Sequence, residues 1–424
     1  MVFLRKNKSI RGVAILFGTA ALLLHDDAKA VGLTTEIAAA VPVRTFSDVG
    51  GHWAESLIRK AAELNLVQGY SDGTFHPDGK ITRAEFAAML NRATKQKTDT
   101  TAAEHSLSGL QNHWSQGEVN KLAVLGFIDQ GDYKDGFSPD RELTRYEMIK
   151  WISSGLAQSE PSFKQAMEDT KGTLLPTPET YKGGIASDQI PYVALVKGTG
   201  IVDGFEDSTF RLAQATTRAE VSAILMRFME VEGNKAEQYK ALNELREVGL
   251  TGSNLTTITK YKYVQDLSGE VRTFAYLKDK NIPLLGALGK MKIHRIIILD
   301  TNSESSSIYS MMFQDKNVIP PKDMYMVFSD ITINSNSNNI SSVALGDAMG
   351  NGITSSDRLT GEVIERYALD TLPRTNVKGF LSKGSQNRVW VTQSIKEIIP
   401  DNRSSVSYTI QTESSDEVTI AMSK

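Results

Sequence analysis

The sequence contains no cysteine, and this absence excludes several kinds of site at once. Without thiols the chain cannot form disulfide bonds, thiolate metal sites or a cysteine nucleophile. A basic surplus is also lacking, because the formal net charge is -3 and the isoelectric point is about 6.1. Nucleic-acid-binding domains normally carry excess positive charge, so the composition argues against a nucleic-acid partner.

Long hydrophobic runs are scarce, and the one at the N-terminus is short. Residues 13–24 are almost wholly apolar, follow a basic start, and precede the small residues Ala28 and Ala30. This is the three-part layout of a secretory signal peptide. The alternative is an uncleaved membrane anchor, but a spanning helix needs about 20 apolar residues. We therefore predict a cleaved signal peptide at residues 1–30, a linker at 31–45, and no transmembrane segment in the mature chain.

The composition of the remainder is typical of a folding chain. Hydrophobic residues make up 40% of the sequence and charged residues 23%. A length of 424 residues is enough for two to four domains.

A four-residue motif, Thr-Arg-x-Glu, occurs three times. It stands at residues 82–85, 144–147 and 217–220. A phenylalanine precedes each motif at the same distance, and an Asp-Gly or Asp-Ser turn signal precedes each phenylalanine; the three are Phe75, Phe137 and Phe210. Helical stretches lie upstream, and apolar residues follow each motif at helical spacing. The sequence thus predicts three helix–turn–helix units at residues 46–95, 105–158 and 163–233, with the phenylalanines in a shared core.

The three units differ in detail. Tryptophan opens the helical stretch in the first two units, at Trp53 and Trp114, whereas Asp188 stands there in the third. Tryptophan at helical spacing is more often a core residue than a sugar-stacking platform, so we predict that both are buried. The third unit opens at residues 168–169, and a Gly/Pro/Thr-rich insertion, roughly 171–184, follows. We predict a surface loop for that insertion.

The threonine and glutamate of each motif have a structural explanation. Thr-x-x-Glu before an apolar helical run is a capping box, in which the two side chains satisfy backbone N–H groups that a helix start leaves unpaired. We assign this role to Thr82, Glu85, Thr144, Glu147, Thr217 and Glu220.

The arginine of the motif is not explained by capping. Arg83, Arg145 and Arg218 each stand at the first position of a predicted helix, where the helix dipole disfavours a cation by about 0.3–1 kcal/mol. Two interpretations are open. The guanidinium and the helix-start N–H groups together bind an anion such as a carboxylate, or the arginine pairs with an acidic residue of a neighbouring unit.

The repeated pattern resembles the S-layer homology (SLH) repeat of bacterial surface proteins. The first unit carries it most fully, with Phe46-Ser47-Asp48, His52-Trp53-Ala54, Asp72-Gly73-Thr74-Phe75 and residues 81–85. The resemblance implies an α-helical bundle with pseudo-threefold symmetry, whose grooves bind secondary cell wall polysaccharide, in many systems through a pyruvylated amino sugar. It assigns ligand contacts to Arg83, Arg145, Arg218, Tyr70, Ser71, Asp72 and Gly73.

The resemblance also carries a location and partners. It implies a secreted protein held at the cell wall or in the S-layer, with wall polysaccharide and other surface-layer subunits as partners. We predict no cofactor and no metal site.

The character of the chain changes after Gly233. Residues 235–248 have helical composition, and β-type segments then alternate with polar turns. The candidate strands are residues 256–264, 271–277, 291–299, 308–313, 325–333, 362–369, 388–395, 406–412 and 418–422. We therefore predict that residues 234–424 form a helical connector and a mostly β domain, either a sandwich or barrel-like.

No catalytic motif stands out in the C-terminal part. His294 is its only histidine, and a hydrogen-bonded or exposed strand histidine is the favoured interpretation. Three roles remain open: a non-enzymatic surface or S-layer-associated protein, an SLH-anchored polysaccharide-active enzyme, and an outer-membrane protein with a periplasmic anchor. We favour the first, because the β part shows no HExxH, Walker or GxSxG motif.

Overall fold

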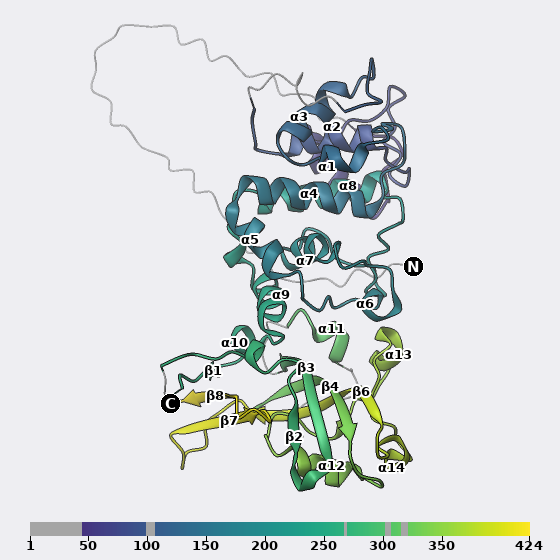
Figure 1. The fold of residues 1–424 in the computed structure, drawn as a ribbon. Helices are drawn as coiled ribbons and strands as arrows, with labels where there is room; N and C mark the ends of the chain where they lie inside the picture. The colour runs from purple at the N-terminus through teal and green to yellow at the C-terminus, as the bar shows by residue number, and fades with distance from the viewer. Residues whose placement is uncertain (1–44, 99–106, 267–268, 302–306, 315–320) are drawn as a thin grey trace, which may run out of the picture. The chain divides into compact units, whose positions relative to one another are not determined.

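The computed structural model describes residues 45–98, 107–266, 269–301, 307–314 and 321–424 (Figure 1). These described residues form one compact unit. The predicted signal peptide and nearly all of the predicted linker lie outside the described residues.

Each of the three repeat units contributes a pair of helices, as the repeats predicted. The first helices of the pairs are α1 (Glu55–Glu63), α3 (Gln116–Val124) and α7 (Ile190–Gly198). The second helices are α2 (Arg83–Ala93), α4 (Arg145–Ser159) and α8 (Arg218–Val231). The apolar residues after each motif are buried, and so are Phe75, Phe137 and Phe210. The predicted shared helical core is therefore present.

The three units close into a ring through the segments before their second helices. The N–H of Ile81 donates to the carbonyl of Thr216 at 3.1 Å, Thr216 donates to Leu143 at 3.1 Å, and Leu143 donates back to Ile81 at 2.8 Å. The residue after each core phenylalanine has a positive φ in every unit, 54° at His76 and 50° at Ser138 and Arg211. Equivalent residues thus adopt equivalent backbone conformations around a pseudo-threefold axis.

The insertion in the third unit is not a surface loop over its whole length. It follows α5 (Pro161–Asp169) and includes α6 (Glu179–Lys182), and residues 173–178 are buried. The Thr173 hydroxyl donates to the carbonyl of Leu245 at 2.7 Å, and the Tyr309 hydroxyl donates to the carbonyl of Leu174 at 2.8 Å. The surface-loop prediction was wrong here because distant parts of the chain supply hydrogen-bond partners for this polar segment.

A helical connector follows the third unit. It consists of the short 3₁₀ turn η3 (Ala236–Gln238), α9 (Lys240–Thr251) and α10 (Leu255–Ile258). Helix α9 packs against α5 and α7. Glycine permits the close approach to α5, because a Cβ atom at Gly249 would lie 2.0 Å from the carbonyl oxygen of Asp169.

The C-terminal part contains two antiparallel sheets, which confirms the mostly β prediction (Figure 1). The five-stranded sheet has the order β2 (Ile282–Leu284), β3 (Gly289–Asp300), β4 (Met324–Ser335), β6 (Gln386–Lys396) and β5 (Asp357–Arg358). The three-stranded sheet has the order β1 (Lys262–Tyr263), β8 (Glu417–Ser423) and β7 (Ser405–Gln411). Both sheets contribute to one apolar core, in which Ile298 and Val391 of the larger sheet join Ile410 and Ile420 of the smaller one.

Several predicted strands are helical instead. Residues 308–313 contain α11 (Ser310–Phe313), and residues 362–369 contain α13 (Val363–Tyr367). The segment 256–264 is divided between α10 and β1, and 271–277 contains the 3₁₀ turn η4 (Phe274–Tyr276). Two further short helices, α12 (Ser342–Met349) and α14 (Val377–Phe380), lie between strands. Short apolar runs bury one side as a helix or as a strand, so periodicity does not separate the two.

In the described segments, no helix is long and apolar enough to cross a membrane.

Candidate functional site

Each repeated motif forms a capping box at the start of its second helix. The Glu85 N–H donates to the Thr82 hydroxyl at 3.2 Å, and the Thr82 N–H donates to Oε2 of Glu85 at 2.9 Å. The same reciprocal pair is present at Thr144 with Glu147 and at Thr217 with Glu220.

The remaining N–H groups at each helix start are also occupied. The Arg83 N–H donates to the carbonyl of Arg141, and the Ala84 N–H donates to the carbonyl of Pro139, both at 3.0 Å. Equivalent bonds hold the starts of α4 and α8. The helix-start N–H groups therefore have partners inside the protein, and an anion at these positions would depend on the guanidinium groups.

The three arginines form a ring of ion pairs with the capping glutamates of the next unit. Arg83 Nε lies 2.9 Å from Oε1 of Glu147, and Arg218 Nη1 lies 2.9 Å from Oε1 of Glu85. Arg145 Nη1 lies 3.6 Å from Oε2 of Glu220. The internal pairing that the sequence left open is thus present at all three positions.

The arginines of these ion pairs are buried. Arg83, Arg145 and Arg218 are only 6%, 4% and 5% exposed. Each guanidinium also donates to the carbonyl of a core phenylalanine, at 2.9 Å from Arg145 to Phe210 and 2.8 Å from Arg218 to Phe75, while Arg83 bonds Phe137 in the same way. Burial lowers the pKa of Arg145, and the charge of Glu220 opposes that shift. We call each arginine, with its glutamate and the turn of the neighbouring unit, a junction.

The predicted contact residues of the first unit belong to the Arg218 junction. The guanidinium carbon of Arg218 lies 4.8 Å from the ring centre of Tyr70. The Tyr70 hydroxyl donates to Glu85 at 2.9 Å, and Tyr70 is 43% exposed. Its neighbours Ser71, Asp72 and Gly73 are exposed on the same turn. The structure brings this turn together with Arg218, whereas Arg83 and Arg145 lie at the two other junctions.

Hydrogen bonds within this turn fix the charge of Asp72. Oδ1 of Asp72 accepts from the hydroxyl and the N–H of Thr74, at 2.6 and 3.0 Å. These bonds lower the pKa of the Asp72 carboxyl below its ordinary value. The turn therefore carries a carboxylate at neutral pH.

The predicted burial of the two tryptophans is wrong. Trp53 is 49% exposed and Trp114 is 61% exposed, because each precedes its helix and does not lie on the inward face. A histidine ring lies beside each indole, with ring centres 5.4 Å apart for His52 and 5.5 Å apart for His113. The two exposed indoles are large flat surfaces of the kind that sugar rings stack on.

The same histidines connect the tryptophans to the junctions. His52 Nε2 lies 3.2 Å from Asp78, and His113 Nε2 lies 3.3 Å from Asp140. The residues after the two aspartates, Gly79 and Arg141, accept the helix-start N–H bonds of Arg218 and Arg83. Sequence reasoning did not find these pairs, although His-Trp and Pro-Asp recur together in the first two units.

In the third unit, a different part of the chain supplies the carboxylate that binds the N–H groups of the turn. Oε2 of Glu179 accepts from the N–H of Phe210 at 2.6 Å, and Oε1 accepts from Arg211 at 2.8 Å. Asp48 makes the equivalent bonds in the first unit, to Phe75 and His76. The carboxylate that closes the third turn thus comes from α6 inside the insertion.

Glu168 and Asp169, the acidic pair at which the sequence opens the third unit, do not bind the N–H groups of this turn. Asp169 pairs with Arg246 of α9 at 2.9 Å, and Glu168 lies beside Lys171. Motif alignment alone did not identify Glu179, because it lies further along the chain than the motif predicts.

The C-terminal histidine is hydrogen-bonded on both sides. Nδ1 of His294 bonds the Asp279 carboxylate, and Nε2 lies 2.7 Å from the hydroxyl of Thr332. Thr332 is 6% exposed, so the hydroxyl has little access to solvent. No group of three or more acidic or histidine side chains suited to a metal ion occurs in the part of the chain that the structure describes.

Comparison with known families identifies the repeat units. The family model of the S-layer homology domain matches residues 45–87, 110–149 and 183–222. The chain therefore contains three S-layer homology domains, as the resemblance of the motifs implied.

Curated relatives share this part of the chain. A cellulosome-anchoring protein of Acetivibrio thermocellus is 33% identical over 147 residues, which cover 34% of this chain and 30% of the relative. An S-layer protein of Bacillus licheniformis is 24% identical over 55% of this chain and 25% of its own length. An amylopullulanase of Thermoanaerobacterium thermosulfurigenes is 28% identical over 45% of this chain and 10% of its own length.

The chain thus spans less than a third of the length of each of these relatives. The three S-layer homology domains and the S-layer relative indicate a location at the cell surface or cell wall. They also indicate an anchoring role for the helical part.

Proposed function

We propose that the three S-layer homology domains hold this protein non-covalently on the bacterial cell wall by binding secondary cell wall polysaccharide at the junctions. The ligand group is an acid on a sugar, such as a pyruvate ketal, and the C-terminal domain is displayed as a surface or S-layer-associated domain. The observation that carries this proposal is the ring of three guanidinium groups, each beside a turn of the neighbouring unit.

Each guanidinium has hydrogen-bond capacity beyond its internal partners. An arginine side chain carries five N–H donors. The contacts with a phenylalanine carbonyl, a glutamate and, at Arg218, the carbonyl of Gln68 use at most three of them. An acid group that reaches a junction would therefore meet a cation that is already oriented, without first breaking the ion pair.

The Arg83 and Arg218 junctions are the better candidates. Each is connected through a His–Asp pair to an exposed tryptophan, Trp114 or Trp53. The third unit has Asp188 and no tryptophan at the equivalent position. We therefore expect the Arg145 junction to contribute least to sugar binding.

The proposal is tested by binding the mature chain to purified Gram-positive cell walls. Helix α9 packs against α5 and α7, so the complete chain from residue 31 is used and not a fragment cut at residue 233. We expect the protein to sediment with intact walls and to remain in solution after the non-peptidoglycan polymer has been extracted. Absence of binding to intact walls would mean that the domains act only as a scaffold.

A double variant separates ligand binding from folding. Arg83→Ala alone leaves the partly buried Glu147 without its cation and the Phe137 carbonyl without its donor, which is expected to destabilise the fold by about 1–3 kcal/mol or more. Arg83→Met combined with Glu147→Gln removes both charges, and glutamine retains the capping box. We expect this double variant to fold with a loss of about 1–3 kcal/mol, because the Phe137 carbonyl loses its donor, and to bind walls several-fold more weakly.

The matched control is Thr82→Ala, which removes a cap at the same helix start. It should lower the free energy of unfolding by about 1 kcal/mol without changing wall binding. If the double variant binds walls as well as the unaltered chain, the Arg83 ion pair is purely structural.

A further inference from the structure

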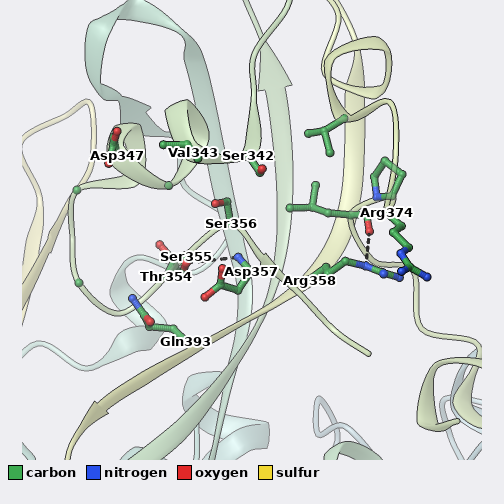
Figure 2. A pocket seen from close by; sticks show the side chains of 16 residues that line it. Ser342, Val343, Asp347, Thr354, Ser355, Ser356, Asp357, Arg358, Arg374 and Gln393 are labelled. Carbon is green, nitrogen blue, oxygen red and sulfur yellow. Dashed lines mark hydrogen bonds between the residues drawn. The ribbon is translucent and has the colours of Figure 1, made fainter. Parts of the chain in front are cut away.

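The C-terminal domain contains a cavity of about 720 Å³ that is separate from the junctions (Figure 2). Its walls come from α12, the loop before β5, and the segment before α14. Ligand sites in proteins typically enclose 300–1,000 Å³, so the cavity has the size of a small-ligand site.

Two arginines line one side of this cavity. Nε of Arg358 donates to the carbonyl of Leu372 at 3.2 Å, and Arg374 is exposed. Among the residues that the structure describes, no carboxylate lies within ion-pair distance of either guanidinium. Figure 2 draws both side chains on the same side of the cavity, away from Asp347. Two neighbouring cations without a counter-ion favour the entry of an anion.

The rest of the lining accepts and donates hydrogen bonds. Asp347 and Asp357 contribute carboxylates, and Ser342, Ser355 and Ser356 contribute hydroxyl groups. Neither aspartate has a basic partner within ion-pair distance in the described part of the chain. Carboxylates without cation partners are strong acceptors for the hydroxyl groups of a polyol.

Hydrogen bonds within the loop before β5 hold this wall of the cavity in place. Oδ1 of Asn351 accepts from the N–H groups of Ile353 and Thr354, at 2.9 and 2.8 Å. Ile353 and Thr354 are buried at 4% and 3% exposure. The wall of the cavity is thus formed before any ligand arrives, which reduces the entropy that binding would lose.

We propose that this cavity binds a sugar unit that carries an acid group. The arginines receive the acid, and the carboxylates of Asp347 and Asp357 and the serine hydroxyls receive the sugar hydroxyls. The acid can be a carboxylate or a phosphate, since a guanidinium recognises both. The inference is independent of wall anchoring, because the cavity shares no residue with the junctions.

The experiment uses the complete mature chain with three probes, namely glucuronic acid, glucose 6-phosphate and uncharged glucose. Affinity is measured by NMR titration, and the bound region is located by hydrogen–deuterium exchange. We expect at least one acidic sugar to bind, to slow exchange in peptides covering residues 342–358 and 370–380, and to bind at least tenfold more tightly than glucose. The more tightly bound acid identifies the group that the arginines receive.

A variant and its matched control complete the test. Arg374→Ala removes an exposed side chain and should weaken the acidic probe about tenfold or more. Arg403→Ala removes another exposed arginine outside the cavity and should leave binding unchanged. The proposal is overturned if neither acid slows exchange at residues 342–358 and 370–380. It is also overturned if glucose binds equally well, or if Arg374→Ala binds like the unaltered chain.

Discussion

The capping glutamates do two things with one side chain. Oε2 of Glu85 accepts from the Thr82 N–H at the start of its own helix, while Oε1 accepts from Arg218 of another unit. Glu147 divides its oxygens between Thr144 and Arg83 in the same way. Local helix capping and contact between units therefore depend on the same carboxylates. This explains how an arginine can stand where the helix dipole disfavours it.

Residue chemistry also predicts how acid affects the first unit. Burial tends to raise the pKa of Asp48, but hydrogen bonds from the N–H groups of Phe75 and His76 outweigh it and lower the pKa below 3.8. A carboxyl whose pKa is lowered in the folded state stabilises the fold above its unfolded pKa. That contribution is lost as the pH falls through the folded pKa.

We therefore expect the stability of Asp48→Asn to fall less steeply below pH 3.8 than that of the unaltered chain. The measurement is the thermal midpoint as a function of pH, with Asp401→Asn as the control because Asp401 is exposed. Identical acid slopes for Asp48→Asn and the unaltered chain would contradict this account.

Among the elements, the contact between α7 and α9 leaves no room for a larger side chain at Gly198. A Cβ atom at Gly198 would lie 2.6 Å from the Cα of Leu242 and 2.8 Å from its Cβ. Gly198→Ala should therefore push the helices apart and lower the free energy of unfolding by about 1–3 kcal/mol.

The matched control is Gly117→Ala in α3, where nothing lies within 4 Å of the added atom. Alanine favours the helix over glycine, so this change should cause no loss. Chemical denaturation of both variants measures the difference. Equal stabilities would show that α9 can shift without a free-energy penalty.

The success of sequence reasoning varied with the length of the pattern. The three motifs predicted α2, α4 and α8, because a cap, an apolar helical face and a repeat all agree there. Long β-type segments likewise predicted β3, β4 and β6. Short runs such as residues 308–313 failed, because four or five apolar residues fit either structure.

The candidate site was predicted only in part. The sequence identified the three arginines but did not decide whether they bind an anionic ligand or an acidic residue of a neighbouring unit. Ion pairs between units depend on the closed ring of the fold, which the sequence pattern does not show. Exposure of Trp53 was missed, because the pattern does not fix on which side of the helix start an indole lies. The cavity of the C-terminal domain has no motif at all, as its lining comes from three separate segments.

At the scale of the whole molecule, one apolar core extends from the repeat units into the C-terminal domain. It includes Phe163 and Leu175 of the third unit together with Ile297 and Phe328 of the five-stranded sheet. Tyr309 is fully buried in it and bonds the carbonyl of Leu174. Elements that share a core unfold together.

Calorimetry of the mature chain should accordingly show a single cooperative transition. Tyr309→Ala should split it into two, because this change removes a large buried side chain and leaves a buried carbonyl without its donor. Two transitions in the unaltered chain would show that the repeats and the sheets unfold independently.

The cyclic hydrogen bonding among Ile81, Thr216 and Leu143 restricts how such a protein can gain or lose repeats. Every unit both gives to one neighbour and receives from the other, so no unit is terminal. Deletion of one copy would open two interfaces, and a single duplicated copy would have no place in the circle. Repeat number is therefore expected to change by whole sets of three, with a complete new circle added each time.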